Sequence, residues 1–238
     1  MCNRVQRFRE WSEIKLQIGF PDHSAIPNLR ASWTVRPTND MLVAVHGAVS
    51  GDRVPAVMRW GLIPSWSKDG TVKFATFNAR ADQLETSKTW LGPWQKKQRC
   101  LIITDGFYEW QWLDPKGRKK QPYSIARADG NLTVMAGIWE GWRSKTNGEA
   151  IRSCAIITTD ANPLMAEIHN TKKRMPVILE PGDWPVWLGE IEADLGDAKA
   201  LLRPAADGTL KAWPVGQAIG AADRDKNDTS ALIEPVAA

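Results

Sequence analysis

Cys100-Leu101-Ile102-Ile103-Thr104 lies near the middle of the chain and is apolar on both faces. A short apolar run of this kind predicts a strand that is buried on both sides. Further strand-like runs are spread along the chain, at residues 41–45, 54–60, 123–127, 132–136, 153–159 and 175–179. Two of these runs flank Ala128-Asp129-Gly130-Asn131, and the Asp-Gly pair predicts a hairpin turn between them.

Helical patterns are fewer. They cover residues 79–87, residues 161–169 with Asp160 as the N-cap, and residues 190–202. Because strands and helices do not alternate regularly, a parallel doubly wound sheet is disfavoured. We therefore expect an α+β fold. It would be a single domain with a strongly bent, mostly antiparallel, barrel-like sheet flanked by helices, to which the segment from Leu210 returns.

The composition indicates a soluble globular protein: the 238 residues are 43% hydrophobic and 24% charged. No window approaches the roughly 20 apolar residues of a membrane helix, and the N-terminus lacks an apolar signal-peptide core. The net charge of +4 is only weak evidence for a nucleic-acid partner. The odd number of cysteines, 3, argues against a disulfide framework, so we expect a cytoplasmic protein.

Neither a metal site nor a nucleotide cofactor is indicated by the motifs. Cys100 and Cys154 lie in apolar strand runs and lack CxxC or HxxxH partners, which makes core packing their expected role. The sequence also contains no Walker or GxGxxG loop. We therefore expect no metal and no cofactor.

Cys2 is the sharpest chemical feature of the sequence. Methionine aminopeptidase removes Met1 when the second residue is small, and the mature chain would then carry an α-amine and a thiol on adjacent carbons. The amine has a pKa of about 7.7–8.0 and the thiol a pKa of about 8.5, so both are available as nucleophiles near neutral pH. The amine condenses with an aldehyde to a Schiff base, and the thiol then closes a five-membered thiazolidine. The alternative is that Cys2 is an incidental small residue.

Two other titratable residues are candidates for proton transfer. Glu109 stands among aromatic residues directly after the central strand, where partial desolvation raises the pKa of a carboxyl group. A strand-edge Glu paired with Lys or Arg is the simpler interpretation. His169, with its near-neutral pKa, precedes Lys172-Lys173-Arg174, a run that would hold a phosphate. The simpler interpretation there is a His that complements the dipole at a helix C-terminus.

Asn78, Arg80 and Trp66 suggest contacts to a ligand. Asn78 could hold a sugar or carbonyl oxygen, or it could only cap the predicted helix. Arg80 would lie in the first helical turn, where the dipole disfavours a cation, so anion binding would explain it. Trp66 ends a Pro-containing loop and could stack on an exposed base, a contact worth roughly 1–3 kcal/mol. For most of the 13 Trp residues, core packing is the expected role.

Seven short motifs stand along the chain in a fixed order. They are Met1-Cys2-Asn3-Arg4, Arg36-Pro37-Thr38, Trp60-Gly61-Leu62-Ile63-Pro64-Ser65-Trp66, Phe77-Asn78-Ala79-Arg80-Ala81, Asp105-Gly106-Phe107-Tyr108-Glu109-Trp110, Ile156-Ile157-Thr158-Thr159-Asp160-Ala161-Asn162, and Ile168-His169 with Arg174-Met175-Pro176-Val177-Ile178-Leu179. Together they resemble the SRAP family (SOS response-associated peptidase, also called abasic site processing proteins), with a weaker match at Trp213-Pro214-Val215. The resemblance implies one SRAP-like domain over residues 1–238, with a core of about 2–216 and a C-terminal segment at 217–238.

The resemblance implies a function at damaged DNA. Such proteins capture abasic sites in single-stranded DNA as a thiazolidine crosslink to the N-terminal Cys, with lyase and self-peptidase chemistry associated. It assigns catalytic roles to Cys2, Asn78, Glu109 and His169. It assigns DNA contacts to Arg4, Pro37, Trp66, Arg80, Thr159, Lys173 and Arg174. It also implies a monomer that is cytoplasmic and, when bound to DNA, nucleoid-associated, with no membrane partner.

Two departures from the family pattern bear on the site. Asn3 stands where the family often has Gly, and a side chain beside the nucleophile would narrow the pocket. Four residues separate His169 from Arg174, a longer step than usual, and two of them are lysines. Which of Lys172, Lys173 and Arg174 contacts phosphate therefore stays open.

Two other functional classes are compatible with parts of the sequence. An N-terminal-nucleophile amidohydrolase, with Cys2 attacking an amide, accounts for Cys2 but not for the Trp66 loop. A non-covalent single-strand binding module accounts for Trp and Arg residues but leaves Cys2, Glu109 and His169 without a role.

Overall fold

The computed structural model describes residues 2–222 and 226–237 and contains two sheets. The first sheet has five strands, in the order β12 (Leu210–Pro214), β8 (Lys120–Arg127), β7 (Gly106–Trp112), β1 (Val5–Arg7) and β2 (Ser32–Val35). The second has the order β11 (Arg174–Pro176), β10 (Ala150–Asp160), β4 (Arg53–Trp60), β3 (Asp40–His46), β6 (Arg99–Thr104) and β9 (Thr133–Arg143), while β5 (Asn78–Arg80) pairs with β10.

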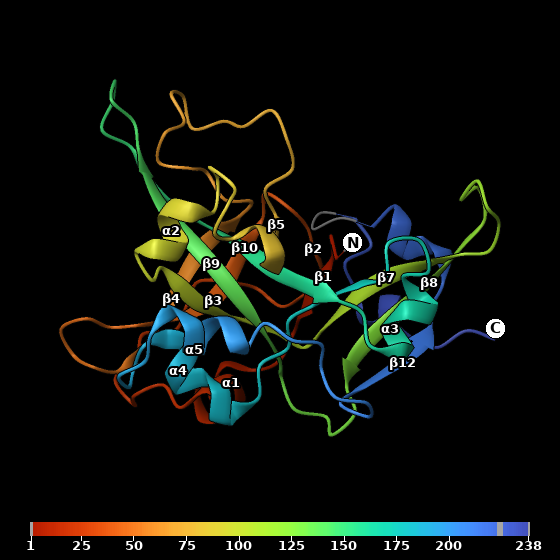
Figure 1. The fold of residues 1–238 in the computed structure, drawn as a ribbon. Coiled ribbons are helices and arrows are strands. Elements are labelled where there is room, and N and C mark those ends of the chain that lie inside the picture. Colours follow the sequence, from red (N-terminus) through yellow and green to blue (C-terminus); the bar gives the residue numbers. More distant parts are fainter. Residues whose placement is uncertain (1, 223–225, 238) are drawn as a thin grey trace.

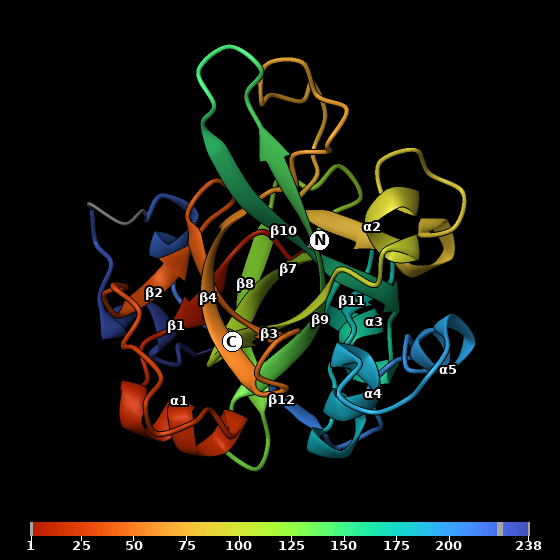
Figure 2. The same cartoon turned by 90° about the vertical axis from the view of Figure 1, so that its left-hand side faces the viewer.

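The second sheet closes into a ring because β9 also pairs with β10. Strands β10, β4, β3, β6 and β9 follow one another around this barrel, which Figure 2 shows nearly end-on. The strand pairings among the described residues are antiparallel except those of β10 with β4 and with β5. The predicted α+β fold with a bent, mostly antiparallel, barrel-like sheet is confirmed.

Short helices cover the outside of the barrel. They are α1 (Trp11–Ile18), α2 (Leu91–Gln95), α4 (Trp184–Leu188) and α5 (Leu195–Ala200), with η1 (Ala81–Gln83) and η2 (Pro181–Asp183) as single turns. Helix α3 (Pro163–Ile168) lies instead beside β7 and β8, and the turns η3 (Gln217–Gly220) and η4 (Ser230–Ile233) belong to the C-terminal segment (Figure 1). None of the helices in the described ranges is long and apolar enough to cross a membrane.

Strand β6 explains why the central run is apolar on both faces. Leu101 and Ile103 pack into a cluster with the barrel helices, whereas Cys100 and Ile102 pack into a second cluster with residues of the other sheet, including Phe107. Alternate side chains of a strand point to opposite faces, so a strand between two cores needs apolar residues at every position. The prediction of a strand buried on both sides is confirmed.

The turn at residues 128–131 does not make the predicted hairpin. Strand β8 before it pairs with β7 and β12, and strand β9 after it pairs with β6 and β10, so the turn carries the chain from one sheet to the other. Asp105 marks another such crossing, between β6 and β7. Its carboxylate accepts hydrogen bonds from the backbone N–H groups of Phe8 (2.6 Å) and Arg9 (3.1 Å), which fastens the end of β1 to this crossing.

The helix predictions were only partly right. The predicted helix at residues 79–87 is wrong: this part of the chain forms the end of strand β5 and the turn η1, because β5 pairs with β10. Helix α3 lies within the predicted 161–169 range, but Asn162 caps it in place of Asp160, accepting from the N–H of Met165 at 3.0 Å. Of the helix predicted at residues 190–202, only the shorter helix α5 forms, and helix α1 was not predicted. The predicted return of the chain from Leu210 is confirmed by β12, which pairs with β8.

Candidate active site

The site forms along the edge of β7 where β1 stops pairing with it. Val5 and Gln6 pair with Phe107 and Gly106, and the N–H of Tyr108 donates to the carbonyl of Arg4 at 3.0 Å. The chain before Arg4 therefore continues along the next residues of β7. This register brings Cys2 and Asn3 to the edge that carries Glu109.

Cys2 is fully buried and belongs to the apolar cluster between the two sheets. Its thiol lies 3.8 Å from the carbonyl oxygen of Arg4, and its own carbonyl accepts a hydrogen bond from Asn78 Nδ2 at 2.8 Å. Burial, together with the neighbouring Glu109 carboxylate, raises the pKa of the Cys2 thiol. The thiol is therefore protonated in this state and needs a base before it can react as a thiolate.

Glu109 is buried beside Cys2 and is held by its own strand. One carboxylate oxygen, Oε1, accepts from the N–H of Trp110 at 3.1 Å, so a backbone donor on the open edge of β7 orients the side chain. A carboxylate fixed in this way can exchange protons with a group at Cys2. The sequence predicted a carboxylate among aromatics at a strand end; the structure places it within β7.

His169 follows α3 and is buried opposite Glu109. Its Nδ1 is 2.9 Å from the carbonyl oxygen and 3.2 Å from the amide nitrogen of Arg174. Since Nδ1 is occupied by this backbone, Nε2 is the ring nitrogen that can meet a substrate. The side chain of Asn170 accepts from the N–H of Trp112 (3.1 Å) and donates to its carbonyl (2.8 Å), which ties the segment after His169 to β7.

Glu109 and His169 line a pocket of about 450 Å³. Its lining combines residues of the N-terminus, β7, β8, the segment after α3 and the C-terminal turn: Asn3, Arg4, Glu109, Trp110, Trp112, Lys120, His169, Thr171, Lys172 and Gly220. The volume lies within the range of about 300–1,000 Å³ typical of ligand sites. The structure thus brings Glu109 and His169 to one pocket, while Cys2 and Asn78, which bond each other, are not among its lining residues.

Arg4 borders this pocket but its guanidinium is already bound. Nη1 donates to Thr34 Oγ1 (2.6 Å) and to the carbonyl of Ala222 (2.5 Å), and Nη2 donates to the carbonyl of Gly220 (2.9 Å). In this state Arg4 fastens the C-terminal turn against β1 and β2. A phosphate would have to compete with these three acceptors.

Arg80 and Arg174 lie on β5 and β11, two short strands that both pair with the end of β10. Arg80, at the end of β5, is half-exposed and forms an ion pair with Asp82 at 2.5 Å. Arg174 is buried and donates from Nη2 to the backbone carbonyl of Thr158 at 2.7 Å. Burial and the nearby positive charge of Arg80 lower the pKa of Arg174.

Asn78 and Arg80 both lie on strand β5. The predictions that Asn78 caps a helix and that Arg80 lies in its first turn are therefore wrong.

The remaining candidates surround this region on separate loops. Pro37 is the second residue of a turn closed by a 2.9 Å bond from the N–H of Asn39 to the carbonyl of Arg36. Thr38 in this turn has a φ of 78°, a strained backbone for a β-branched residue. Trp66 is 43% exposed on the loop between β4 and β5, which is drawn in orange in Figure 1. Its indole N–H donates to the carbonyl of Lys88 at 3.3 Å.

Thr159 and Lys173 differ in how open they are to a ligand, since Thr159 is buried and Lys173 is exposed. The hydroxyl of Thr159 donates to the carbonyl of Leu202 at 3.2 Å. Lys173 has a left-handed backbone with φ 46°, and its N–H donates to the carbonyl of His169 at 2.9 Å. Lys172 lines the pocket instead of its neighbour. The sequence leaves open which of the three basic residues contacts phosphate, and its motifs do not single out Trp112, Lys120 or Asn170.

The model of the SOS response associated peptidase (SRAP) family matches residues 1–222. The chain belongs to the SRAP family. The resemblance drawn from the seven motifs is thereby confirmed. The residues of this SRAP protein that lie beyond the match include η4 in the C-terminal segment.

Named relatives and solved structures agree with the family. The SRAP chain is 34% identical over 234 residues to abasic site processing protein YoqW of Bacillus subtilis, covering 98% of this chain and 99% of that protein. It is 34% identical over 212 residues to abasic site processing protein HMCES of Gallus gallus, covering 79% of this chain and 60% of that protein. A crystal structure of a Bacteroides thetaiotaomicron protein matches with a TM-score of 0.84 at 25% identity, covering 99% of this chain and 100% of that one.

Groups of three or more metal-binding side chains do not occur in the described part of this SRAP protein. The three cysteines are free thiols. Cys2, Glu109 and His169 bring a thiol, a carboxylate and an imidazole to this region.

Proposed function

We propose that this protein is an abasic-site sensor that binds single-stranded DNA and crosslinks covalently to the lesion. Three observations carry the proposal: Asn78 bonds the carbonyl of Cys2, the Glu109 carboxylate acts on the Cys2 thiol, and Glu109 and His169 line one pocket. The names of the relatives support it, since several are called abasic site processing proteins. Crosslinking would shield the lesion from strand cleavage.

The crosslink forms in two steps after Met1 is removed. The α-amine of Cys2 attacks the aldehyde carbon of the ring-opened deoxyribose, a C–N bond forms, and water leaves to give an imine. The thiol then adds to the same carbon, and its proton passes to the imine nitrogen. The product is a five-membered thiazolidine. Neither step changes the overall oxidation level, so no redox partner is required.

Glu109 and His169 divide the proton transfers. Because burial raises the pKa of the Cys2 thiol, a base must take its proton before the carbon–sulfur bond forms. Glu109 is the carboxylate next to that thiol and serves as this base. His169, with Nε2 toward the pocket, donates to the sugar oxygen or the phosphate during ring opening. Asn78 holds the backbone of Cys2 during both steps.

The same residues would perform two associated reactions. In a lyase reaction, the imine acidifies the neighbouring carbon of the sugar, a base removes its proton, and the 3′ phosphate leaves. In self-processing, the Cys2 thiol attacks the carbonyl carbon of the preceding peptide bond, and the Cys2 nitrogen leaves as the free α-amine. Water then hydrolyses the resulting thioester and releases a leader where one is present. The lyase reaction uses the α-amine of residue 2, whereas self-processing uses the Cys2 thiol. Cys2→Ala therefore removes self-processing but leaves an α-amine that can still form the imine.

DNA binding would use the basic and aromatic residues around the site. Arg80 and Arg174 supply charge beside β10, Trp66 stacks on a base, and Pro37 shapes the channel wall. Thr159 and Arg4 are weaker candidates, because their polar side-chain groups are engaged within the protein, whereas Lys173 is exposed. We propose that the protein acts as a monomer in the cytoplasm, associated with the nucleoid when bound to DNA.

The test is a denaturing gel without reductant, run after mixing the protein with a single-stranded oligonucleotide that carries one abasic site. We expect a shifted band with the wild type and none with Cys2→Ala. Cys154→Ala is the matched control, because Cys154 is a buried cysteine of the same apolar cluster and should leave the band. Absence of the band with folded wild-type protein would overturn the proposal.

The same samples separate the other two classes. A non-covalent binding module would shift the DNA only on a native gel and would lose it as salt rises. An amidohydrolase would release ammonia or an amine from a small amide and would ignore the DNA.

A further inference from the structure

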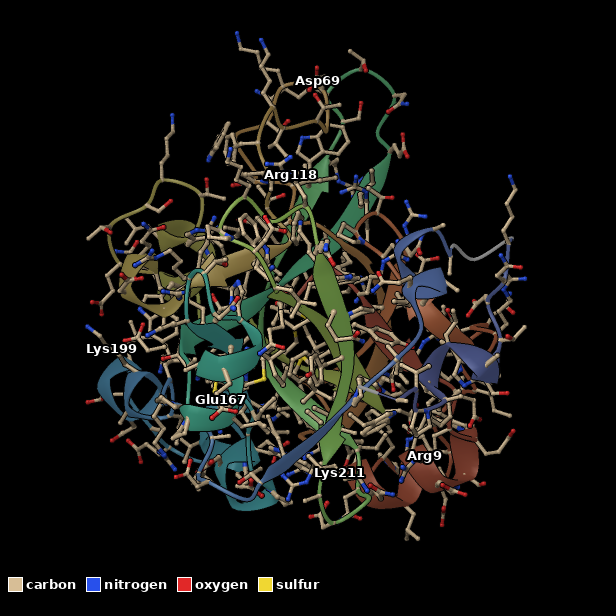
Figure 3. The ribbon with its side chains drawn as sticks, turned by 90° about the vertical axis from the view of Figure 1, so that its right-hand side faces the viewer. Arg9, Asp69, Arg118, Glu167, Lys199 and Lys211 are labelled. Atoms are coloured by element: carbon tan, nitrogen blue, oxygen red, sulfur yellow. The ribbon has the colours of Figure 1, made fainter. Side chains whose placement is uncertain are left out.

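The loop between β4 and β5, which carries Trp66, is fastened to the hairpin of β9 and β10 by a single side chain. The indole N–H of Trp142, on β9, donates to the backbone carbonyl of Ser67 at 2.8 Å. Ser67 directly follows Trp66, so this bond fixes the backbone from which the exposed indole projects. Figure 2 shows the loop (orange) and the hairpin (green) projecting together from one end of the barrel, and Figure 3 shows Asp69 of the loop beside the hairpin.

A close backbone contact reinforces this bond. Gly70 has a φ of 77°, and a Cβ added there would lie 3.1 Å from two ring atoms of Trp142. The loop backbone therefore lies directly against the indole. Trp142 is only 6% exposed and its N–H is engaged, so the ring has little room to move away. Within the loop, the hydroxyl of Ser67 donates to the carbonyl of Thr71 at 2.8 Å, which closes a compact turn on the ring.

The indole of Trp66 is held in turn by a segment outside the loop. Its N–H donates to the carbonyl of Lys88 at 3.3 Å, and the Lys88 ammonium lies 5.1 Å from the ring centre, within cation–π distance. Lys88 thus covers one face of the ring, while 43% of Trp66 stays exposed. A ring that is already fixed loses little conformational freedom when a planar ligand stacks on it, which favours binding.

We propose that Trp142 is a positioning residue: it sets Trp66 in place so that the indole takes one base of the DNA on the face that Lys88 leaves open. Stacking requires two planes at close approach and is therefore sensitive to where the ring is held. Trp142 acts only through the loop, because it is buried beneath Ser67 and Gly70. The inference rests on the proposed function, from which it takes the stacking role of Trp66.

Trp142→Phe separates positioning from packing. Phenylalanine keeps an aromatic ring against Gly70 but has no N–H for the carbonyl of Ser67. The matched control is Trp184→Phe on the outside of the barrel. Trp184 is 5% exposed, and its N–H likewise donates to a backbone carbonyl, that of Leu179, at 3.2 Å. Both substitutions therefore remove one buried indole hydrogen bond, and only one of them touches the Trp66 loop.

The measurement is the crosslinking rate at increasing concentrations of a single-stranded oligonucleotide with one internal abasic site. For Trp142→Phe, we expect the half-saturating DNA concentration to rise by about tenfold, the loss of one stacking contact at the low end of its range. The rate at saturating DNA should stay unchanged, because the chemistry at Cys2 is untouched. Trp184→Phe should match the wild type in both quantities. Urea unfolding shows that each variant is folded.

A double variant tests whether the effect passes through the Trp66 ring. Trp66→Ala alone should raise the half-saturating concentration at least as much as Trp142→Phe does. Adding Trp142→Phe to Trp66→Ala should then change nothing further, because there is no ring left to position. A tryptophan with only a structural role would instead give the same factor in both backgrounds.

Gly70→Ala reaches the same contact from the loop side. The added Cβ would press on the Trp142 ring and displace the loop, so the half-saturating concentration should rise here too. Gly51→Ala is its control, since Gly51 has a φ of 76° but a Cβ there would meet no atom within 4 Å. It carries the backbone cost of a left-handed alanine without moving the loop. Gly70→Ala decides the question if Trp142→Phe does not fold.

Two results would overturn the inference while leaving the proposed function standing. One is a half-saturating concentration for Trp142→Phe and Gly70→Ala equal to that of the wild type. The other is an equal effect of Trp142→Phe with and without Trp66. A wild type that forms no crosslink contradicts the proposed function itself. In that case the same variants are compared by fluorescence anisotropy in their binding to an undamaged single-stranded oligonucleotide, so the two failures are distinguishable.

Discussion

Asn78 Nδ2 donates a 2.8 Å hydrogen bond to the carbonyl oxygen of Cys2, and this bond joins the barrel to the N-terminal strand. Asn78 is placed by the parallel pairing of β5 with β10, in which it faces Ile156. The register of the barrel therefore fixes the backbone of the proposed nucleophile. Asn78 Oδ1 is buried and has no hydrogen-bond partner among the described residues, so it is available to orient the Cys2 amine or the sugar.

Asn78→Asp should slow crosslinking while the protein stays folded. The substitution keeps the size of the side chain but replaces the donor by a carboxylate oxygen that repels the Cys2 carbonyl. Loss of a hydrogen bond that leaves a buried partner unsatisfied costs about 1–3 kcal/mol, so we expect a rate lower by roughly tenfold or more. Crosslinking time courses measure it. Asn147→Asp is the control, because Asn147 only accepts from the N–H of Glu149, as an Asp also can. Equal rates for Asn78→Asp and wild type would contradict the positioning role.

Gly137→Ala should destabilise the barrel. A Cβ at Gly137 of β9 would lie 2.7 Å from Cys100 Sγ and 2.7 Å from Ile102 Cγ1, in the core between the sheets. Overpacking of this kind costs about 1–3 kcal/mol. Gly141→Ala is the control on the same strand, since its Cβ would meet no atom within 4 Å. Urea unfolding measures both, and equal free energies of unfolding for the two variants would show that the core yields at Gly137.

Stability should fall as pH rises above about 8.5, the pKa of a cysteine in the unfolded chain. Burial raises the pKa of Cys154 to about 12, so the folded protein keeps a proton that the unfolded chain releases. Between those two values, each such thiol lowers the free energy of unfolding by about 1.4 kcal/mol per pH unit.

Cys154→Ala isolates one of these thiols. Its absolute stability will differ from the wild type because it leaves a small cavity, so the slope of the free energy of unfolding against pH is the measurement. Between pH 9 and pH 11, we expect that slope to be shallower than in the wild type by about 1.4 kcal/mol per pH unit. An unchanged slope would mean that Cys154 does not titrate as a buried thiol.

The strands of the barrel were predictable because each carries its own signal. The apolar runs that became β3, β4, β6 and β10 bury side chains whatever their partners, so composition alone locates them. Which strands pair with one another cannot be predicted from these runs. Asp129-Gly130 suits a tight turn, but turn chemistry does not tell whether the following strand returns to the same sheet or enters another.

The same limit applies to the site. Cys2, Glu109 and His169 were identifiable because each has reactive chemistry in a short motif. Asn78 was placed on a helix, since its strand is held only by pairing with a segment far along the chain. Asn170 was missed because its role is a contact with Trp112, 58 residues away, and an asparagine in a loop carries no signal for that.

Arg4→Lys should loosen the C-terminal segment. The Arg4 guanidinium donates to Thr34 and to the carbonyls of Gly220 and Ala222, three acceptors that a single ammonium cannot meet in the same geometry. Hydrogen bonds to charged groups contribute about 1.5–3 kcal/mol each, so we expect a loss of about 3 kcal/mol in urea unfolding. Limited proteolysis should also cut the 217–237 segment faster.

Arg203→Lys is the control for this substitution, because Arg203 is largely exposed and its change should cost less than about 0.5 kcal/mol. The salt dependence of DNA binding by Arg4→Lys then tells its two roles apart. Lysine keeps the positive charge, so a phosphate contact would survive with nearly the same slope, whereas loss of the anchor would lower stability and crosslinking together. Arg4→Lys protein with wild-type stability and protease resistance would show that the C-terminal segment is held by other contacts, such as the 2.6 Å bond from the N–H of Trp33 to Asp228.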